Sequence, residues 1–404
     1  MAITPLPEAT IRQLGSSMTI TTPATLVKEL LDNAIDAKAT SVTILISQNT
    51  VDRVEVSDNG NGIHPDDFES LGRPGYTSKL RSYEQLSTIG GSSLGFRGVA
   101  LASANAMAKK ISVTTRSPTD QHATTFDLSP AGGIEKCVPA AAPVGTIVRA
   151  TELFAHHPVR LKTMVKRATA THREIKDLLL SYALARPELR LQLKEVNSSK
   201  APWCYISEPN VDVQNAVLQC FGTELVSQCV WRTSEDMLAG AQFGDVEQVA
   251  SPGYQDESWV MFEAFLPKHD ADLTKISKGA FFSIDSRPVS SSYDTPKKLL
   301  AIYKLGVASA MRIAPAMLKH PFIRLNIRCS PRSYDPNVEP SKNRVLFHRE
   351  EHILKAFREF ISSTYPIAAG EQSEPTAIRD SRAGLGGTGN TECRAPQIML
   401  DAQV

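Results

Sequence analysis

The stretch Glu-Leu-Leu-Asp-Asn-Ala-Ile-Asp-Ala at residues 29–37 decides the fold, and it closes a segment that predicts an amphipathic helix over residues 23–37. Apolar residues recur there at helical spacing, at Val27, Leu30, Leu31 and Ala34. Glu29 and Asn33 are four positions apart and share one face, roughly 130° from the apolar stripe. A solvated helix face gives the same pattern. A nucleotide hydrolase, however, needs both groups, since the carboxylate orients water and the amide oxygen binds Mg²⁺.

A second stretch, Asp-Asn-Gly-Asn-Gly at residues 58–62, ends an alternating strand pattern over residues 53–57. A carboxylate at Asp58 can accept a hydrogen bond from an exocyclic amine such as that of adenine. The glycines that follow let the backbone approach a flat base. A plain boundary between a strand and a turn is the other explanation for this run.

A third stretch is the glycine-rich run Gly-Gly-Ser-Ser-Leu-Gly-Phe-Arg-Gly at residues 90–98, which leads into a predicted helix at 99–108. Free backbone N–H groups and a helix N-terminus suit phosphates. Residues 77–79, Thr-Ser-Lys, add two hydroxyls and a cation just before it. No Gly-Lys-Ser or Gly-Lys-Thr follows the glycines, which excludes a Walker-type P-loop. Each stretch alone is weak evidence for a binding site, but the order and spacing of all three point to a nucleotide site.

Outward from these stretches, helical and strand patterns alternate, which predicts a layered α/β domain over residues 1–195. Residues 194–201 are typical of a turn or linker, and a second, smaller α+β domain is expected over 202–365. No aromatic residue follows Tyr365, and residues 366–404 hold five glycines and three prolines. We expect that last segment to be a disordered tail or the start of a linker.

The motifs resemble those of GHKL ATPases, in the form found in the MutL family of mismatch-repair proteins and closest to its eukaryotic post-meiotic-segregation type. The resemblance covers about residues 5–365 and includes Tyr-Thr-Ser-Lys (76–79), Gly-Phe-Arg-Gly-Val-Ala-Leu (95–101), Gly-Thr (145–146) and Asp-Pro-Asn-Val-Glu-Pro-Ser-Lys-Asn-Arg-Val (335–345). It implies an α+β fold: a GHKL (Bergerat) ATPase α/β sandwich with ATP under a mobile lid, then a domain like domain 2 of ribosomal protein S5.

The resemblance also implies a role for each matching residue. Glu29 would be the general base, and Lys342 would reach the γ-phosphate from the second domain. Asn33 would hold Mg²⁺, and Asp58 with Gly62 would read adenine, supported by Thr146. The remaining ATP contacts would surround the phosphates: Thr77, Ser78, Lys79, Leu94, Gly95, Phe96, Arg97 and Gly98. ATP and Mg²⁺ are therefore the expected cofactors.

The sequence departs from the family pattern at several places. The lid motif normally has a glutamate where this chain has Val99, which affects the expected lid closure and hydrolysis rate. His156 replaces an asparagine, and residues 14–19 replace a usual Ile-Ala-Ala-Gly-Glu-Val. Residues 120–123, Asp-Gln-His-Ala, spell the start of an endonuclease motif, but Phe126 stands where that motif needs glutamate. We take that match as coincidence and expect no endonuclease activity.

The charge is balanced, with 44 basic and 43 acidic residues, so only local clusters could bind nucleic acid. The helix after Pro158 is basic; a solvated face explains this equally well, but the resemblance favours contact with the DNA backbone through Arg160, Lys162, Lys166 and Arg167. Six scattered cysteines and the lack of a secretory signal or a long apolar run indicate a soluble intracellular protein without a membrane partner.

Two functions remain open from the sequence. The first is an ATP-driven switch, in which lid closure and association of N-terminal modules accompany slow hydrolysis and DNA binding. Its expected partners are another MutL homologue and a MutS-type mismatch-recognition complex in the nucleus. The second is a scaffold for another MutL homologue that hydrolyses ATP weakly or not at all, which Val99 favours and the intact pair of Glu29 and Asn33 argues against.

Overall fold

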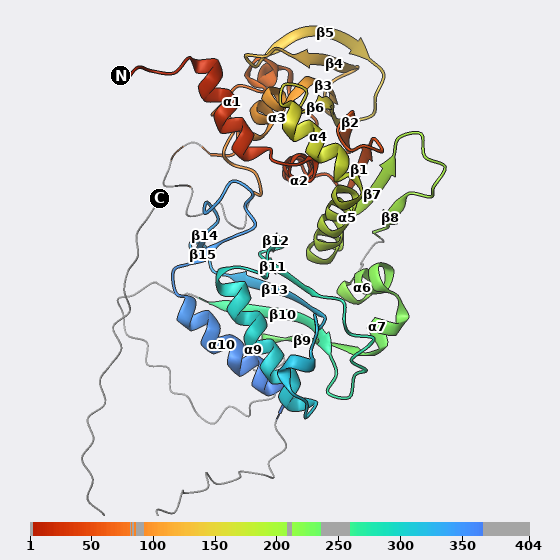
Figure 1. The fold of residues 1–404 in the computed structure, drawn as a ribbon, viewed down its shortest axis with the longest axis vertical. Coiled ribbons are helices and arrows are strands. Elements are labelled where there is room, and N and C mark those ends of the chain that lie inside the picture. The colour runs from red at the N-terminus through yellow and green to blue at the C-terminus, as the bar shows by residue number, and fades with distance from the viewer. Residues whose placement is uncertain are drawn as a thin grey trace, which may run out of the picture. The chain divides into compact units, whose positions relative to one another are not determined.

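The computed structural model describes residues 3–80, 82, 85, 93–207, 212–235 and 259–366 (Figure 1). They belong to one compact unit that ends at residue 367. Apart from Pro366, the expected tail at 366–404 lies outside the described residues, as do the first three residues of the glycine-rich run. Two β-sheets, each with its own helices, organise the described part of the chain.

The first sheet has eight strands in the order β5-β4-β3-β6-β2-β1-β7-β8. Neighbours pair antiparallel except β1 and β7, which are parallel. The strands are β1 (Ser41–Ile46), β2 (Arg53–Asp58), β3 (Ala108–Arg116), β4 (Ala123–Leu128), β5 (Ile134–Ala140), β6 (Gly145–Leu153), β7 (Arg190–Glu195) and β8 (Trp203–Tyr205). The predicted domain boundary between residues 195 and 202 therefore falls between two paired strands of one sheet, and it stays a prediction.

The helices on this sheet are α2 (Pro23–Asp36), the 3-10 helix η1 (Pro65–Ser70), α3 (Ala100–Met107), α4 (Pro158–Lys166) and α5 (Ala168–Ala185), and α1 (Glu8–Thr19) packs against α3. Helix α2 begins as its sequence predicts. Pro23 occupies its first turn, and the side chains of Thr22 and Thr25 form a reciprocal capping box with each other's backbone N–H groups. The long helix predicted after Pro158 is two helices, since the backbone of Arg167 leaves helical geometry between them.

The second sheet has five strands in the order β12-β11-β13-β10-β9. They are β9 (Cys229–Thr233), β10 (Val260–Pro267), β11 (Ala280–Ile284), β12 (Arg287–Val289) and β13 (Ile323–Cys329). Around them lie α6 (Val213–Phe221), α7 (Thr223–Ser227), α9 (Asp294–Ala310), η3 (Pro315–Met317), the strand pair β14 (Tyr334–Asp335) and β15 (Leu346–Phe347), and α10 (Glu350–Thr364). Figure 1 shows α9 and α10 together against this sheet.

Two apolar clusters hold these layers together. One lies between the second sheet and its helices and includes Phe262, Leu325 and Phe357. The other fills the first sheet and its helices and continues into the second domain, where it takes in Phe265 and Phe322. The opposite parity of Phe262 and Phe265 on β10 explains this arrangement, because successive side chains of a strand point to opposite faces. The second sheet is thus buried on both faces.

Candidate functional site

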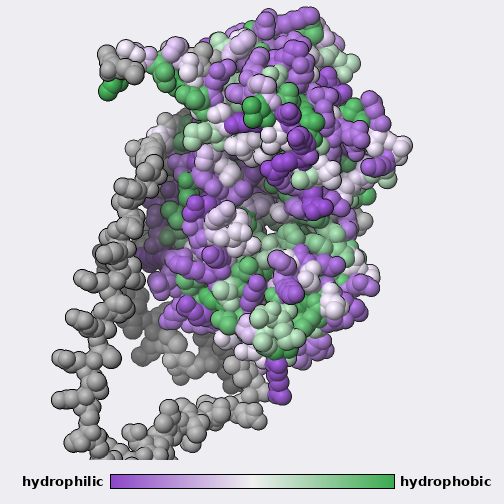
Figure 2. Space-filling model, in the orientation of Figure 1, coloured by the Kyte–Doolittle hydropathy of each residue, from purple (hydrophilic) through white to green (hydrophobic). Residues whose placement is uncertain are grey.

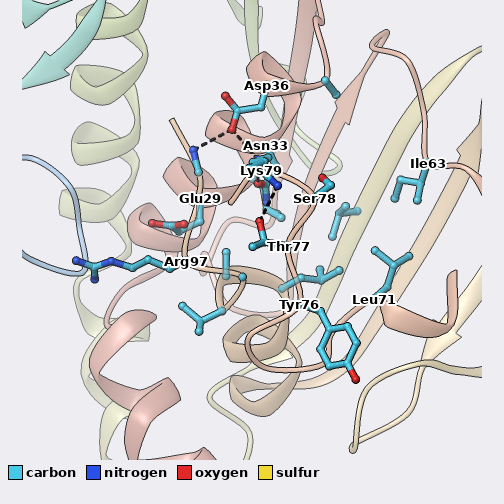
Figure 3. Close-up of a pocket in the computed structure, with 18 of the residues that line it drawn as sticks. Glu29, Asn33, Asp36, Ile63, Leu71, Tyr76, Thr77, Ser78, Lys79 and Arg97 are labelled. Carbon is cyan, nitrogen blue, oxygen red and sulfur yellow. Dashed lines mark hydrogen bonds and ion pairs between the residues drawn. The ribbon is translucent and has the colours of Figure 1, made fainter. Parts of the chain in front are cut away.

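A cavity of about 720 Å³ lies beside α2, the end of β2 and the lid segment, by which we mean residues 93–98 (Figure 3). Thirteen of the fourteen predicted ATP-site and catalytic residues line it: Glu29, Asn33, Asp58, Gly62, Thr77, Ser78, Lys79, Gly95, Phe96, Arg97, Gly98, Thr146 and Lys342. The fourteenth, Leu94, is buried, and its side chain belongs to the first apolar cluster. The structure therefore brings distant parts of the sequence to one place.

Glu29 and Lys342 form a buried ion pair in this cavity. The Nζ atom of Lys342 donates a hydrogen bond to Oε2 of Glu29 at 2.9 Å, and the two side chains are 3% and 7% exposed. The ammonium also lies 5.7 Å from the centre of the Phe96 ring. The backbone of Lys342 has φ of 54°, a conformation seldom adopted by residues with a Cβ atom. A lysine that a turn would usually expose is instead directed into the site.

A second buried carboxylate, Asp32, lies one turn along α2. Lys28 contacts it at 3.0 Å, and the hydroxyl of Tyr182 on α5 donates a hydrogen bond to it. Burial alone would raise the pKa of Asp32, but the charges of Lys28 and Lys342 and the bond from Tyr182 bring that pKa below its ordinary value. Asp32 is therefore ionised, and it ties α2 to α5 behind the cavity.

Asn33 and Asp36 share the ammonium of Lys79. Its Nζ atom lies 2.9 Å from Oδ1 of Asn33 and 2.6 Å from Oδ2 of Asp36. Figure 3 shows the side chains of Glu29, Asn33 and Asp36 along α2, with Lys79 facing the last two. A positive charge therefore lies at the amide oxygen that the resemblance assigns to Mg²⁺. Oxygen atoms of an amide and a carboxylate also form the type of ligand set that Mg²⁺ prefers, so these residues fit that ion.

Asp36 also anchors the lid segment. Its two carboxylate oxygens accept hydrogen bonds from the backbone N–H groups of Leu94 and Gly95 and from the hydroxyl of Ser93, each at 2.8 Å. A Cβ atom on Gly95 would lie about 3.0 Å from Lys79 Nζ, so glycine leaves room for this ammonium. The end of α2 thus fixes the start of the lid.

The lid also contacts the second domain. Nε of Arg97 donates to Oδ1 of Asn337 at 2.8 Å, and Arg287 donates to the backbone carbonyls of Ser93 and Leu94. Gly98 has φ of 64°, and a Cβ atom there would meet the carbonyl oxygen of Tyr76 at 2.7 Å. Only glycine accommodates this approach without a shift of the neighbouring loop.

The opposite end of the cavity is built around Asp58. Its Oδ1 atom accepts hydrogen bonds from the backbone N–H groups of Gly60, at 2.8 Å, and Thr146, at 3.3 Å. Burial raises the pKa of Asp58, and the two N–H donors offset this only in part. Gly62 has φ of 68° and leaves no room for a Cβ atom, which would lie 2.2 Å from the carbonyl oxygen of Arg116. A carboxylate with a free oxygen and a bare backbone suit a flat ligand that carries an amine.

The predicted DNA contacts on α4 and at its C-cap, Arg167, differ in their surroundings. Lys162 and Lys166 are exposed, and Arg167 is exposed but paired with Glu174 at 3.0 Å. Arg160 is half-buried, and its Nη1 atom donates to the backbone carbonyls of Ser17, at 3.2 Å, and Ile20, at 3.5 Å. The guanidinium of Arg160 therefore fastens the end of α1, a use that the basic pattern of the helix did not predict.

Three residues of the site escaped the reasoning from sequence: Asp32, Asp36 and Arg287. Asp36 carried a usable signal, because it is three positions after Asn33 and so shares its helix face. Arg287 carried none, since its hydrogen-bond partners are more than a hundred positions away. Asp32 has a local partner in Lys28, but its bond to α5 comes from Tyr182, 150 positions away. Asp120, of the supposed endonuclease motif, accepts hydrogen bonds from Ser117. No group of three metal-ligating side chains occurs among the described residues, and none of their helices is long and apolar enough to cross a membrane.

Comparisons with known proteins agree with this picture. A family model described as "Histidine kinase-, DNA gyrase B-, and HSP90-like ATPase" matches residues 20–138, and one described as "DNA mismatch repair protein, C-terminal domain" matches residues 246–366. The chain is 30% identical to human "PMS1 protein homolog 1" over 96% of its length and 39% of that protein. It is 30% identical to the DNA mismatch repair protein MutL of Halobacterium salinarum over 87% of its length and 48% of that protein.

The chain thus spans less than half the length of these two relatives. The chain has the same fold as a crystal structure of the "N terminal domain of a DNA repair protein", with a TM-score of 0.67 at 23% identity. The alignment covers 88% of this chain and 97% of the other. Together with the two sheets, the matches confirm the predicted fold class, a GHKL ATPase sandwich followed by a smaller α+β domain.

Proposed function

Since this chain belongs to the MutL family of DNA mismatch-repair proteins, we propose that its described part works as an ATP-driven switch that hydrolyses Mg-ATP slowly. Nucleotide binding by the first domain follows from its match to the ATPase model. The observation that carries the switch is the buried pair of Glu29 and Lys342, because a group of the second domain there neutralises the proposed base of the first.

Hydrolysis in this proposal uses the groups that line the cavity. Glu29 accepts a proton from water while the water oxygen bonds to the γ-phosphorus, and the bond from that phosphorus to the bridging oxygen of ADP breaks. Lys342 leaves Glu29 for the γ-phosphate, which exposes the carboxylate to the attacking water. The Thr77 and Ser78 hydroxyls, Lys79 and the N–H groups of residues 96–98 hold the phosphates. Mg²⁺, when bound, would neutralise phosphate charge, and Asn33 would hold it.

Lid closure in the switch leads to association of two N-terminal modules. The N-terminal segment supports this, because exposed apolar side chains follow one another along it, Ile3 and Leu6 before α1 and Ile11, Leu14 and Met18 on α1. Figure 2 shows apolar residues along this N-terminal segment. The bonds from Arg160 hold the end of α1 in place. We propose that the other module belongs to another MutL homologue.

DNA binding is the second half of the proposed switch. The exposed cations Lys162 and Lys166 on α4, and Arg167 directly after it, would contact phosphates without regard to sequence, together with Arg160. The printed name of the Halobacterium salinarum relative places that protein in DNA mismatch repair, so we further propose a MutS-type mismatch-recognition complex as a partner and the nucleus as the location.

The experiment that tests the function is single-turnover ATP hydrolysis by the wild type and by Glu29→Ala, side by side. Val99, half-buried in the cavity wall where the family motif has glutamate, favours a second candidate. In that candidate the chain is a scaffold for another MutL homologue and turns over little or no ATP. Hydrolysis that depends on Glu29 supports the switch. A wild type that binds its partner but has no turnover above Glu29→Ala supports the scaffold.

A further inference from the structure

A strained hairpin of the second domain ends at the lid. Strands β11 and β12 pair antiparallel, with Ile284 opposite Arg287, so only Asp285 and Ser286 connect them. Both connecting residues have positive φ, 47° and 61°. Two-residue turns of this kind favour asparagine and glycine, because a Cβ atom is unfavourable there. A turn built from aspartate and serine needs support from its surroundings.

That support comes from β13. The side-chain oxygen of Asn326 accepts a hydrogen bond from the backbone N–H of Ser286 at 3.1 Å, and Asp285 accepts one from the N–H of Cys329 at 3.1 Å. The N–H of Asp285 donates to the carbonyl of Ile327 at 2.9 Å. Asn326 is itself buried, 3% exposed. The turn is therefore fixed to the centre of the second sheet, and so is the residue that follows it.

That residue, Arg287, is 1% exposed and reaches the first domain. Its Nη2 atom donates to the carbonyl oxygen of Ser93 at 2.6 Å, and Nη1 donates to that of Leu94 at 3.2 Å. These are the residues whose N–H and hydroxyl groups Asp36 binds from the other side. The start of the lid is thus held between the end of α2 and a guanidinium of the second domain.

The way Arg287 is buried argues against a purely stabilising role. Its hydrogen-bond partners are neutral carbonyls, and its Nε atom is buried without a hydrogen-bond partner among the described residues. The carboxylates of Asp32 and Asp285 interact with its charge but form no ion pair with it. Burying a charged group in this way is unfavourable compared with an apolar side chain. A planar guanidinium that donates to two successive carbonyls fixes the orientation of that backbone segment, which a lysine or an apolar residue cannot do.

We infer that Arg287 is a positioning residue for ATP hydrolysis, which sets the lid against the phosphates and makes the lid's position depend on the second domain. The inference rests on the proposed function. It predicts a defect in turnover and not in nucleotide affinity, because Arg287 touches the lid's backbone and does not line the cavity. A loss of general stability would instead change affinity and turnover together.

The test compares Arg287→Lys with Arg324→Lys as a matched control. Arg324 is 3% exposed in the same sheet and also donates to a carbonyl of the first domain, that of Leu184 at 3.0 Å, but it does not touch the lid. For Arg287→Lys we expect an ATP affinity within about threefold of the wild type. Its single-turnover rate at saturating ATP should be about a hundredfold lower, which is the loss of rate that a small misplacement of reacting groups causes. The control should keep its rate within about twofold.

Amide hydrogen exchange at residues 93–98 without nucleotide gives a readout that needs no turnover. Arg287→Lys should exchange there about tenfold faster than the wild type, and the control should not. If Arg287→Lys does not fold, Asn326→Ser releases the turn with the guanidinium intact and carries the same expectations. Wild-type rate and wild-type exchange in these variants, or an equal loss in the control, would overturn the inference. A wild type without turnover would end the proposed hydrolysis, while the exchange result would still decide whether Arg287 holds the lid.

Discussion

The Nζ atom of Lys342 lies 2.9 Å from the Oε2 atom of Glu29, although 313 positions of sequence separate the two residues. Each buried charge is held by the other, because either one alone in the interior would be costly. Another charged group can separate Glu29 from Lys342 only if it takes the place of one of them as the partner of the other. A γ-phosphate meets this condition for Lys342, and ADP lacks that group. In the proposed switch, the pair would therefore supply the difference between ATP and ADP that a conformational change needs.

The first prediction concerns the proposed base. Glu29→Gln should lower the single-turnover rate of ATP hydrolysis by about 10²–10⁴-fold, because no other side chain would take the proton of water. ATP affinity should stay close to that of the wild type. Glu29→Ala should show the same loss of rate. Turnover equal to that of the wild type would remove Glu29 from the mechanism.

The second prediction concerns the response to the γ-phosphate. Lys342→Met should no longer compact with a non-hydrolysable ATP analogue, as followed by small-angle scattering, while the wild type compacts with the analogue and not with ADP. The single variant should also lose about 3–5 kcal/mol of stability, because Glu29 is left buried and unpaired. Combining it with Glu29→Gln should recover much of that loss, which thermal unfolding would measure. A Lys342→Met variant that still compacts as the wild type does would show that Lys342 is not the sensor.

The third prediction concerns the metal. Chelating Mg²⁺ should weaken ATP binding by the wild type. In Asn33→Ala, the factor by which Mg²⁺ strengthens ATP binding should be about tenfold smaller. Lys79 now contacts Asn33, so Lys79→Met tests whether the ammonium competes with the ion for this oxygen. Calorimetric titration with and without Mg²⁺ measures all three proteins. Equal ATP affinity of the wild type under both conditions would contradict the assignment of Asn33.

The fourth prediction concerns pH. Burial raises the pKa of Asp58, so this carboxylate takes up its proton at a higher pH than an ordinary aspartate does. An ionised carboxylate is the better acceptor for an amine, so ATP affinity should fall as pH is lowered through that raised pKa. Asp58→Asn should bind about tenfold more weakly at neutral pH and lack this decline. The titration of ATP itself is common to both proteins and cancels in the ratio of their affinities. A ratio that stays constant with pH would argue against the contact.

The fifth prediction concerns DNA. Binding should be independent of sequence, and replacing both Lys162 and Lys166 by Gln should lower the slope of log affinity against log salt by about two, one unit for each lost phosphate contact. Two exposed lysines of the second domain, Lys297 and Lys319, give a matched control. Arg160→Gln should mainly free α1, because Arg160 binds the carbonyls of Ser17 and Ile20. An affinity insensitive to salt would show that α4 is only a solvated surface.

The sequence alone predicts much of the site because its strongest signals are local. The four-residue spacing of Glu29 and Asn33 places both on the open face of α2, and the glycines at 62 and 98 occupy backbone conformations that residues with a Cβ atom avoid. Lys342 enters only through the family resemblance, since a lysine in a turn is by itself an ordinary surface residue. Its burial depends on an approach between two domains, which no local pattern encodes.

What the sequence could not predict lies in tertiary contacts. The basic pattern of α4 is the same whether its cations face solvent or a neighbour, so the bonds from Arg160 to α1 needed the structure. The same holds for Arg287, which follows an unremarkable strand and reaches carbonyls 193 and 194 positions away. The division of one predicted helix at Arg167 has no proline or glycine to announce it.

The apolar cluster of the first domain also has a consequence for biosynthesis, since it continues through Phe265 to Phe322. When residue 195 has left the ribosome, most of the eight-stranded sheet has been synthesised, but Phe265 and Phe322, which complete its apolar cluster, have not. At roughly 5–20 residues per second, Phe322 follows on the order of ten seconds later. During that interval we expect part of this apolar cluster to be uncovered, and chaperone binding to be strongest during translation. Slow codons between 195 and 322 would lengthen that exposure and lower the yield of folded protein.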